Sequence, residues 1–197
     1  MPYMEDLYEA THENVQLAVR EGVEVVWVER IAGRTAVPVL TRVGGRFPLP
    51  ATGGGLVLLA YAPQEVLDEV LSRPLERFTE RTIVQPRALR SALAEVRRTG
   101  LAVSDRQVTM DALSVAAPVR GQGEEVVAAL SLVVAAEGAR PQAIAPAVLA
   151  AARAISRSLG SQQASASPAG ENLRAPAYPA EPSFTGWAGR AGDTVRG

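Results

Sequence analysis

The sequence predicts an α+β domain in which an antiparallel sheet of about six strands is flanked by helices. Two observations carry this prediction. Runs in which apolar and polar residues alternate are joined by short turns, which favours antiparallel pairing. Stretches with apolar residues three or four positions apart, the spacing of an amphipathic helix, lie before, between and after these runs. The predicted order is one helix, three strands, several helices, three strands and a closing helix.

The first part of the chain is predicted to hold a short helix and three strands, at residues 2–11, 15–20, 23–31 and 35–43. In the first strand Gln16 lies on the more polar face of a half-buried pattern. Glu21-Gly22 has the composition of a two-residue hairpin turn. Pro38 lacks a backbone N–H, so the third strand is expected at a sheet edge or a bulge.

A glycine-rich stretch follows, with Thr52 placed to cap a helix whose first turn is Gly53, Gly54 and Gly55. Each glycine costs about 1 kcal/mol of helix stability relative to alanine, so the run needs a reason. One reason is that exposed amides at a helix N-terminus can bind a carboxylate or phosphate. Another is close packing of the helix on the sheet. Taken alone, the segment favours the packing explanation, because glycine-rich turns are common.

The remaining elements are three helices at residues 63–70, 86–99 and 141–159 and three strands at residues 101–108, 113–119 and 126–134. Residues 72–85 are rich in arginine and are predicted to form a solvated connection. Gly100 and Gly160 are expected to end the last two helices. Residues 161–197 have few periodic apolar positions and are predicted to be a disordered tail, which leaves one domain at residues 1–160.

Composition excludes several kinds of chemistry. The chain of 197 residues has a formal net charge of -1, without the basic excess of a nucleic-acid-binding surface. It contains neither cysteine nor lysine, which excludes disulfides, thiolate metal sites, Schiff bases and a phosphate-loop lysine. The one histidine, His12, is expected in a solvated turn. We therefore expect no enzyme activity and no metal or other cofactor.

The chain also lacks the marks of export or membrane insertion. Its first residues are acidic and have no apolar core, unlike a signal peptide. Its longest apolar runs are far shorter than a membrane span. A cytoplasmic protein without membrane contact is expected.

Six blocks of sequence, taken in order, resemble the C-terminal effector-binding domain of IclR-type transcriptional regulators. The blocks lie at residues 14–31, 43–55, 93–102, 114–119, 127–131 and 154–160, and the resemblance as a whole spans about residues 3–160. The resemblance implies a GAF-like sheet with a small-molecule pocket on one face. It also implies a homodimer or homotetramer.

The resemblance further implies a set of effector-binding residues. Backbone amides come from Gly53 and Gly54, next to the cap Thr52, and polar side chains come from Ser114 and Ser131. An acidic family position falls near Ser104 or Asp105. With the resemblance added, anion binding becomes the favoured reason for the glycines.

Four positions depart from the family pattern: Pro50 replaces a usual histidine, Leu56 a lysine, Ser114 a cysteine and Val133 a serine. Each change removes polarity or charge near the pocket, and a buried carboxylate needs compensating donors. The hypothesis is an effector that is aromatic or weakly acidic, or larger and more apolar than a small keto acid. The family's winged helix-turn-helix is not seen ahead of Tyr3, so this chain alone is not expected to bind DNA.

Other functions remain open at this stage. The chain could be an interaction module that pairs with full-length regulators. It could be an enzyme acting on a small anionic substrate, with Asp105 or Asp111 as the base. It could also be a domain that has lost its ligand.

Overall fold

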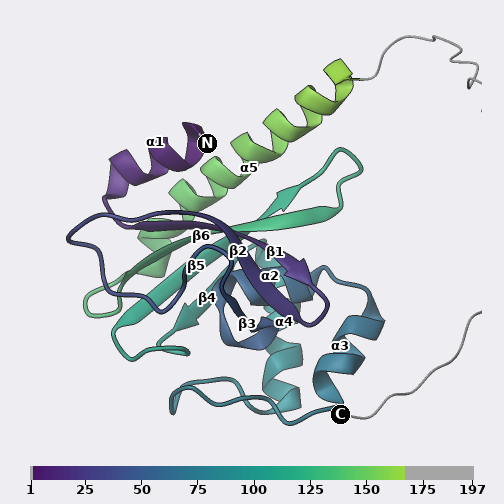
Figure 1. Cartoon of the computed structure of the whole chain (residues 1–197). Coiled ribbons are helices and arrows are strands. Elements are labelled where there is room, and N and C mark those ends of the chain that lie inside the picture. Colours follow the sequence, from purple (N-terminus) through teal and green to yellow (C-terminus); the bar gives the residue numbers. More distant parts are fainter. Residues whose placement is uncertain (1, 167–197) are drawn as a thin grey trace, which may run out of the picture. The chain divides into compact units, whose positions relative to one another are not determined.

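A six-stranded antiparallel sheet runs through the centre of the domain in the order β3-β2-β1-β6-β5-β4 (Figure 1). The computed structural model describes residues 2–166. The strands are β1 (Asn14–Glu21), β2 (Glu24–Ile31), β3 (Arg46–Pro48), β4 (Ala102–Asp105), β5 (Ala112–Arg120) and β6 (Val126–Ala135). The helices are α1 (Pro2–Thr11), the 3-10 turn η1 (Leu49–Ala51), α2 (Gly53–Ala60), α3 (Gln64–Leu71), α4 (Pro86–Thr99) and α5 (Pro141–Ala166). The predicted fold class and order of elements are confirmed.

Both faces of the sheet are covered by helices, and this gives the domain two cores (Figure 1). Helices α2, α3 and α4 pack on one face, while α1 and α5 pack on the other. Side chains of a strand alternate between the two faces. In β1, Val15 and Leu17 enter the core beneath α1 and α5, and Ala18 enters the core beneath α2.

The expectation that Gln16 lies on the more polar face of a half-buried strand needs correction. Gln16 is only 2% exposed, on the same face as Ala18. An alternating pattern shows which side of a strand is more polar, but it cannot show whether helices cover that side too. In β1 a second layer of helices does cover it.

The third predicted strand, at residues 35–43, is wrong. Residues 32–45 form an irregular loop, and the third strand is the short segment Arg46–Pro48 at the sheet edge. The loop is held by side chains instead of a strand ladder: Asn14 Nδ2 donates to Val37 O at 2.9 Å, and Arg30 Nη1 donates to Thr41 O at 3.3 Å. The hairpin turn between β1 and β2 is also shifted by one residue, to Gly22-Val23.

Two other boundaries differ from the prediction. Strand β4 ends at Asp105, because Arg106 adopts a left-handed backbone with φ 57° and the chain turns there. Helix α5 passes through Gly160 to Ala166, since Gly160 keeps helical geometry. The tail predicted for residues 161–197 lies mostly outside the described residues. Among the described helices, none combines the length and apolar character needed to span a bilayer.

Candidate functional site

On four strands, the sheet face beneath α2 changes from alanine to a polar residue two positions further along the strand. Ala18, Ala129, Ala116 and Ala102 are buried on this face. Each strand has a polar residue two positions from its alanine: Gln16, Ser131, Ser114 and Ser104. Because the strands are antiparallel, all four polar residues lie on the same side of their alanines. Gln16 pairs in register with Ser131, and Ser114 pairs with Ser104. Between β6 and β5 the two pairs are offset by two residues, since Ser131 faces Ala116 and Ser114 faces Val133. The polar side chains therefore form a stepped polar patch, in which Ser131 and Ser114 are diagonal neighbours.

The N-terminus of α2 lies where this change occurs. A Cβ added at Gly54 would lie 3.8 Å from Ala129 Cβ, and one added at Gly53 would lie 2.8 Å from Ser114 Oγ. The small alanines allow the helix to sit directly on the sheet. The first turn of α2 thus ends beside the polar patch.

The residues at the start of α2 differ in what they contribute to the helix. Thr52 is the cap, and its hydroxyl oxygen accepts a hydrogen bond from Gly55 N at 3.0 Å. A Cβ on Gly55 would lie 2.1 Å from Leu49 O, so packing alone requires glycine there. Gly54 has no such clash. The amides of Gly53 and Gly54 are the first two of the helix and have no acceptor within it.

A cavity opens between the α2 N-terminus, the polar patch and two loops. The empty space within it is about 510 Å³, part of which is open solvent. Its lining combines apolar and neutral polar groups: Gln16, Trp27, Val39, Leu40, Thr41, Thr52, Gly53, Gly54, Ser104, Gln107, Val108, Thr109, Ala112, Ser114, Ser131 and Val133. No ionisable side chain is among these residues. Across the described chain, no group of histidine and carboxylate residues could hold a metal ion.

The loop of residues 32–45 supplies one wall of the cavity through Val39, Leu40 and Thr41. Gln16 Nε2 donates to Thr41 Oγ1 at 2.6 Å. The wall is therefore tied to the polar patch by a side-chain hydrogen bond, although Leu40 itself is 64% exposed.

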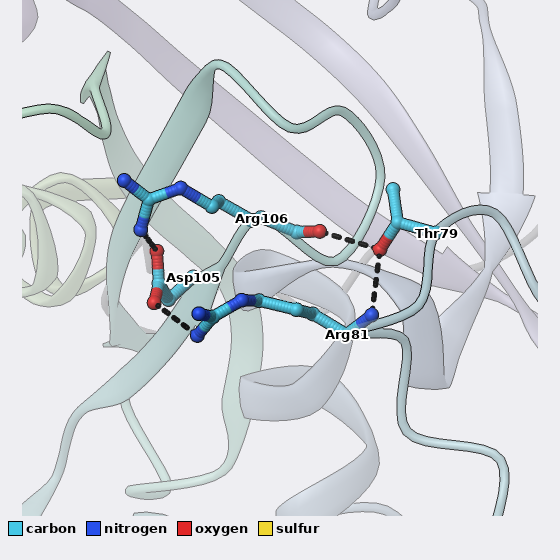
Figure 2. Close-up of polar contacts among 4 residues, drawn as sticks. All are labelled: Thr79, Arg81, Asp105 and Arg106. Atoms are coloured by element: carbon cyan, nitrogen blue, oxygen red, sulfur yellow. Dashed lines mark hydrogen bonds and ion pairs between the residues drawn. The ribbon is translucent and has the colours of Figure 1, made fainter.

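The β4–β5 loop supplies the opposite part of the lining through Gln107, Val108 and Thr109. Residues 79–82 hold this loop in place. Thr79 Oγ1 donates to Arg106 O at 2.6 Å, and Thr82 Oγ1 donates to Gln107 O at 2.7 Å (Figure 2 shows the Thr79 contact). The stretch predicted as a solvated connection thus has a buried anchor, since Thr82 is 6% exposed.

Six of the seven residues expected to bind an effector line the cavity: Thr52, Gly53, Gly54, Ser104, Ser114 and Ser131. The seventh, Asp105, does not. The carboxylate of Asp105 lies between two guanidinium groups (Figure 2). It pairs with Arg106 Nη1 at 2.8 Å and with Arg81 Nη1 at 3.3 Å. Alternation explains the difference, because Asp105 follows Ser104 and points to the other side of the strand.

The two supports of the β4–β5 loop should differ in their effect on stability. Thr82→Val removes a buried hydroxyl that donates to Gln107 O and accepts from Phe78 N and Thr79 N. We expect a loss of about 1–3 kcal/mol in the free energy of unfolding. Asp105→Asn weakens partly exposed ion pairs and should cost less than about 1 kcal/mol. Urea denaturation of both variants measures this, and a larger loss for Asp105→Asn would contradict the assigned roles.

Several lining residues escaped prediction from sequence. Trp27 is 3% exposed and sits against Phe47, with ring centroids 5.6 Å apart. Gln107 follows the turn at Arg106 and is 7% exposed. For Gln16 the sequence did contain a signal that it lines the cavity. It lies two positions from an inward-facing alanine, as do the three serines of the lining. Gln107 lies in an irregular loop, where no periodicity reports burial.

The chain resembles proteins of one family over most of its length. Residues 1–157 match the family described as Bacterial transcriptional regulator IclR C-terminal. Among curated proteins, the HTH-type transcriptional regulator XynR of Escherichia coli is 34% identical over 131 residues, which are 66% of this chain and 52% of that protein. The Pca regulon regulatory protein of Pseudomonas putida is 32% identical over 66% of this chain and 46% of its own. The chain thus spans about half the length of these relatives.

Solved structures agree in fold. An IclR homolog from Microbacterium hydrocarbonoxydans, crystallised with 4-hydroxybenzoate, has a TM-score of 0.78 and 39% identity over 81% of this chain and 66% of that chain. The C-terminal domain of the E. coli transcriptional regulator KdgR has a TM-score of 0.72 and 27% identity over 81% of this chain and 94% of that chain.

Proposed function

Since the chain belongs to the IclR family of bacterial transcriptional regulators, as their C-terminal effector-binding domain, we propose that the cavity at the N-terminus of α2 binds a small aromatic acid. The observation that carries this proposal is the combination of free helix amides with a lining that has no ionisable side chain. The amides of Gly53 and Gly54 favour one negative group. The serine hydroxyls around them add neutral donors.

The lining argues for one carboxylate and an apolar body. Burying a second carboxylate would cost several kcal/mol unless a cation or further donors compensated it. No such cation lines the cavity among the described residues. Trp27, Val108 and Val133 instead present the apolar surface that suits an aromatic ring. The relative crystallised with 4-hydroxybenzoate supports the same ligand class.

In the whole protein, effector binding would control transcription through a DNA-binding region that residues 1–157 do not include. The matched relatives are transcriptional regulators, which are not enzymes. We accordingly propose a sensor without catalytic activity. The homo-oligomer and the cytoplasmic location stay predictions, and light scattering of the purified chain tests the first.

A thermal-shift screen tests the proposed ligand class. The panel holds benzoate, 4-hydroxybenzoate, neutral aromatics and short dicarboxylates. A ligand at about 100 times its Kd stabilises the fold by about 2.7 kcal/mol. For a domain of this size this raises Tm by roughly 5–10 °C. We expect the shift from aromatic acids; a shift only from dicarboxylates, or from no compound, would contradict the proposal.

The pH dependence of binding should be simple. Because no ionisable side chain lines the cavity, affinity for an aromatic acid should stay constant between about pH 6 and pH 8. It should weaken only when the ligand's own carboxyl group becomes protonated at lower pH. Calorimetric titrations across this range measure it. A several-fold change of Kd near neutral pH would indicate a titrating protein group at the site.

A further inference from the structure

One buried polar atom in the cavity lining lacks a partner in the protein. Among the described residues, two buried side-chain polar atoms have no hydrogen bond, Arg30 Nε and Gln107 Oε1. Of these two residues only Gln107 lines the cavity. Leaving a buried acceptor unpaired costs about 1–3 kcal/mol, so such groups in folded proteins generally have a use.

The backbone of Gln107 is held firmly, which makes its side chain suitable for recognition. Its carbonyl accepts from Thr82 Oγ1 at 2.7 Å, and the preceding carbonyl, of Arg106, accepts from Thr79 Oγ1 at 2.6 Å (Figure 2 shows the second contact). The guanidinium of Arg106 is tied to Asp105, away from the cavity. The loop is thus fixed on the side opposite the lining before any ligand arrives, which reduces the entropy lost on binding.

Two parts of the lining therefore differ in hydrogen-bond character. The α2 amides of Gly53 and Gly54 are donors, whereas Gln107 Oε1 is an acceptor. A carboxylate is attracted to the first and has no proton to give to the second. Oε1 needs a hydroxyl or N–H on another part of the same ligand.

We propose that Gln107 is a specificity-determining residue, which selects aromatic acids that carry a hydroxyl group over those without one. The inference rests on the proposed function, because it assigns a second contact within the same cavity. A ligand hydroxyl donates to Oε1 and satisfies it. An unsubstituted ring leaves Oε1 both unpaired and shielded from water.

The test compares benzoate, 3-hydroxybenzoate and 4-hydroxybenzoate by isothermal titration calorimetry. For the wild-type chain we expect at least one hydroxylated acid to bind about tenfold or more tightly than benzoate, which corresponds to about 1.4 kcal/mol. In Gln107→Met, which keeps the length of the side chain but removes the acceptor, this ratio should fall to about twofold or less. Benzoate should bind the variant at least as well as it binds the wild type.

The control and the opposing outcomes are distinct. Gln64→Met makes the same change on α3, where the side chain is exposed and bonds Asp68, and should leave the ratio unchanged. Equal binding of all three acids to the wild type would overturn the role of Gln107 and leave the proposed function intact. So would an unchanged ratio in Gln107→Met. Failure of all three acids to bind the wild type would overturn both. If the variant does not fold, equal binding of all three acids to the wild type still overturns the role of Gln107.

Discussion

Replacing Gly55 with alanine should destabilise the domain by about 3 kcal/mol or more, the upper part of the range for overpacking. The added Cβ would lie 2.1 Å from Leu49 O and 2.9 Å from Leu49 Cα. Both are backbone atoms of η1, so relief requires the turn and the helix to move apart. The gain of about 1 kcal/mol in helix propensity is too small to offset this. In a thermal melt we expect Tm to fall by roughly 6–12 °C.

Gly54→Ala is the matched control, one residue earlier in the same turn. Its Cβ would make ordinary contacts, 3.8 Å from Ala129 Cβ and 3.9 Å from Ala18 Cβ. The helix propensity of alanine then acts alone, and Tm should stay the same or rise slightly. An equal fall of Tm in both variants would mean that the backbone freedom of glycine, and not the close approach of Gly55 to Leu49, is the reason for the glycines.

Replacing Ser114 with aspartate should abolish binding of aromatic acids without unfolding the domain. A Cβ on Gly53 would lie 2.8 Å from Ser114 Oγ, so a carboxylate at position 114 would lie next to the first turn of α2. This carboxylate would occupy the helix amides in place of the ligand's carboxylate, and the two negative charges would repel each other. At a separation of about 4 Å the repulsion is worth roughly 4 kcal/mol for a partly buried pair, so a loss of at least 100-fold in affinity is expected.

The stability of the same variant should change in the opposite direction. A negative group at a helix N-terminus contributes about 0.3–1 kcal/mol, so Tm should be unchanged or higher. Ser114→Asn has the same shape without the charge and should keep affinity for 4-hydroxybenzoate within about tenfold of the wild type. Calorimetry and thermal melts of both variants measure these effects. Undiminished binding by Ser114→Asp would place the ligand's carboxylate elsewhere.

Periodicity predicted the sheet well where a strand is long and both ends have clear turns, as in β5 and β6. It failed at residues 35–43. There apolar residues serve as a wall of the cavity, and their backbone is held by Asn14 and Arg30. Those side-chain contacts join residues far apart in the sequence, so a local pattern could not reveal them.

The helix start and the three serines of the cavity lining could be predicted, and the lining residues in loops could not. Thr52, Gly53 and Gly54 stand out because a cap followed by three glycines is unusual for a helix. The serines lie at fixed positions in strands. Of the two alternatives for the acidic family position, Ser104 lines the cavity and Asp105 does not, because one residue of alternation reverses the side to which a side chain points. Gln107 depends on a loop whose shape is set by Thr79 and Thr82.

The most direct test of the account observes the backbone amides of Gly53 and Gly54 by ¹H–¹⁵N TROSY NMR during titration with 4-hydroxybenzoate. A carboxylate that accepts hydrogen bonds from these amides moves their proton signals downfield. We expect saturable downfield shifts at Gly53 and Gly54, accompanied by changes at Ser114 and Ser131 and lost in Ser114→Asp. Saturable shifts that spare both glycines, or none at millimolar ligand, would contradict the central claim that the α2 N-terminus holds an aromatic acid.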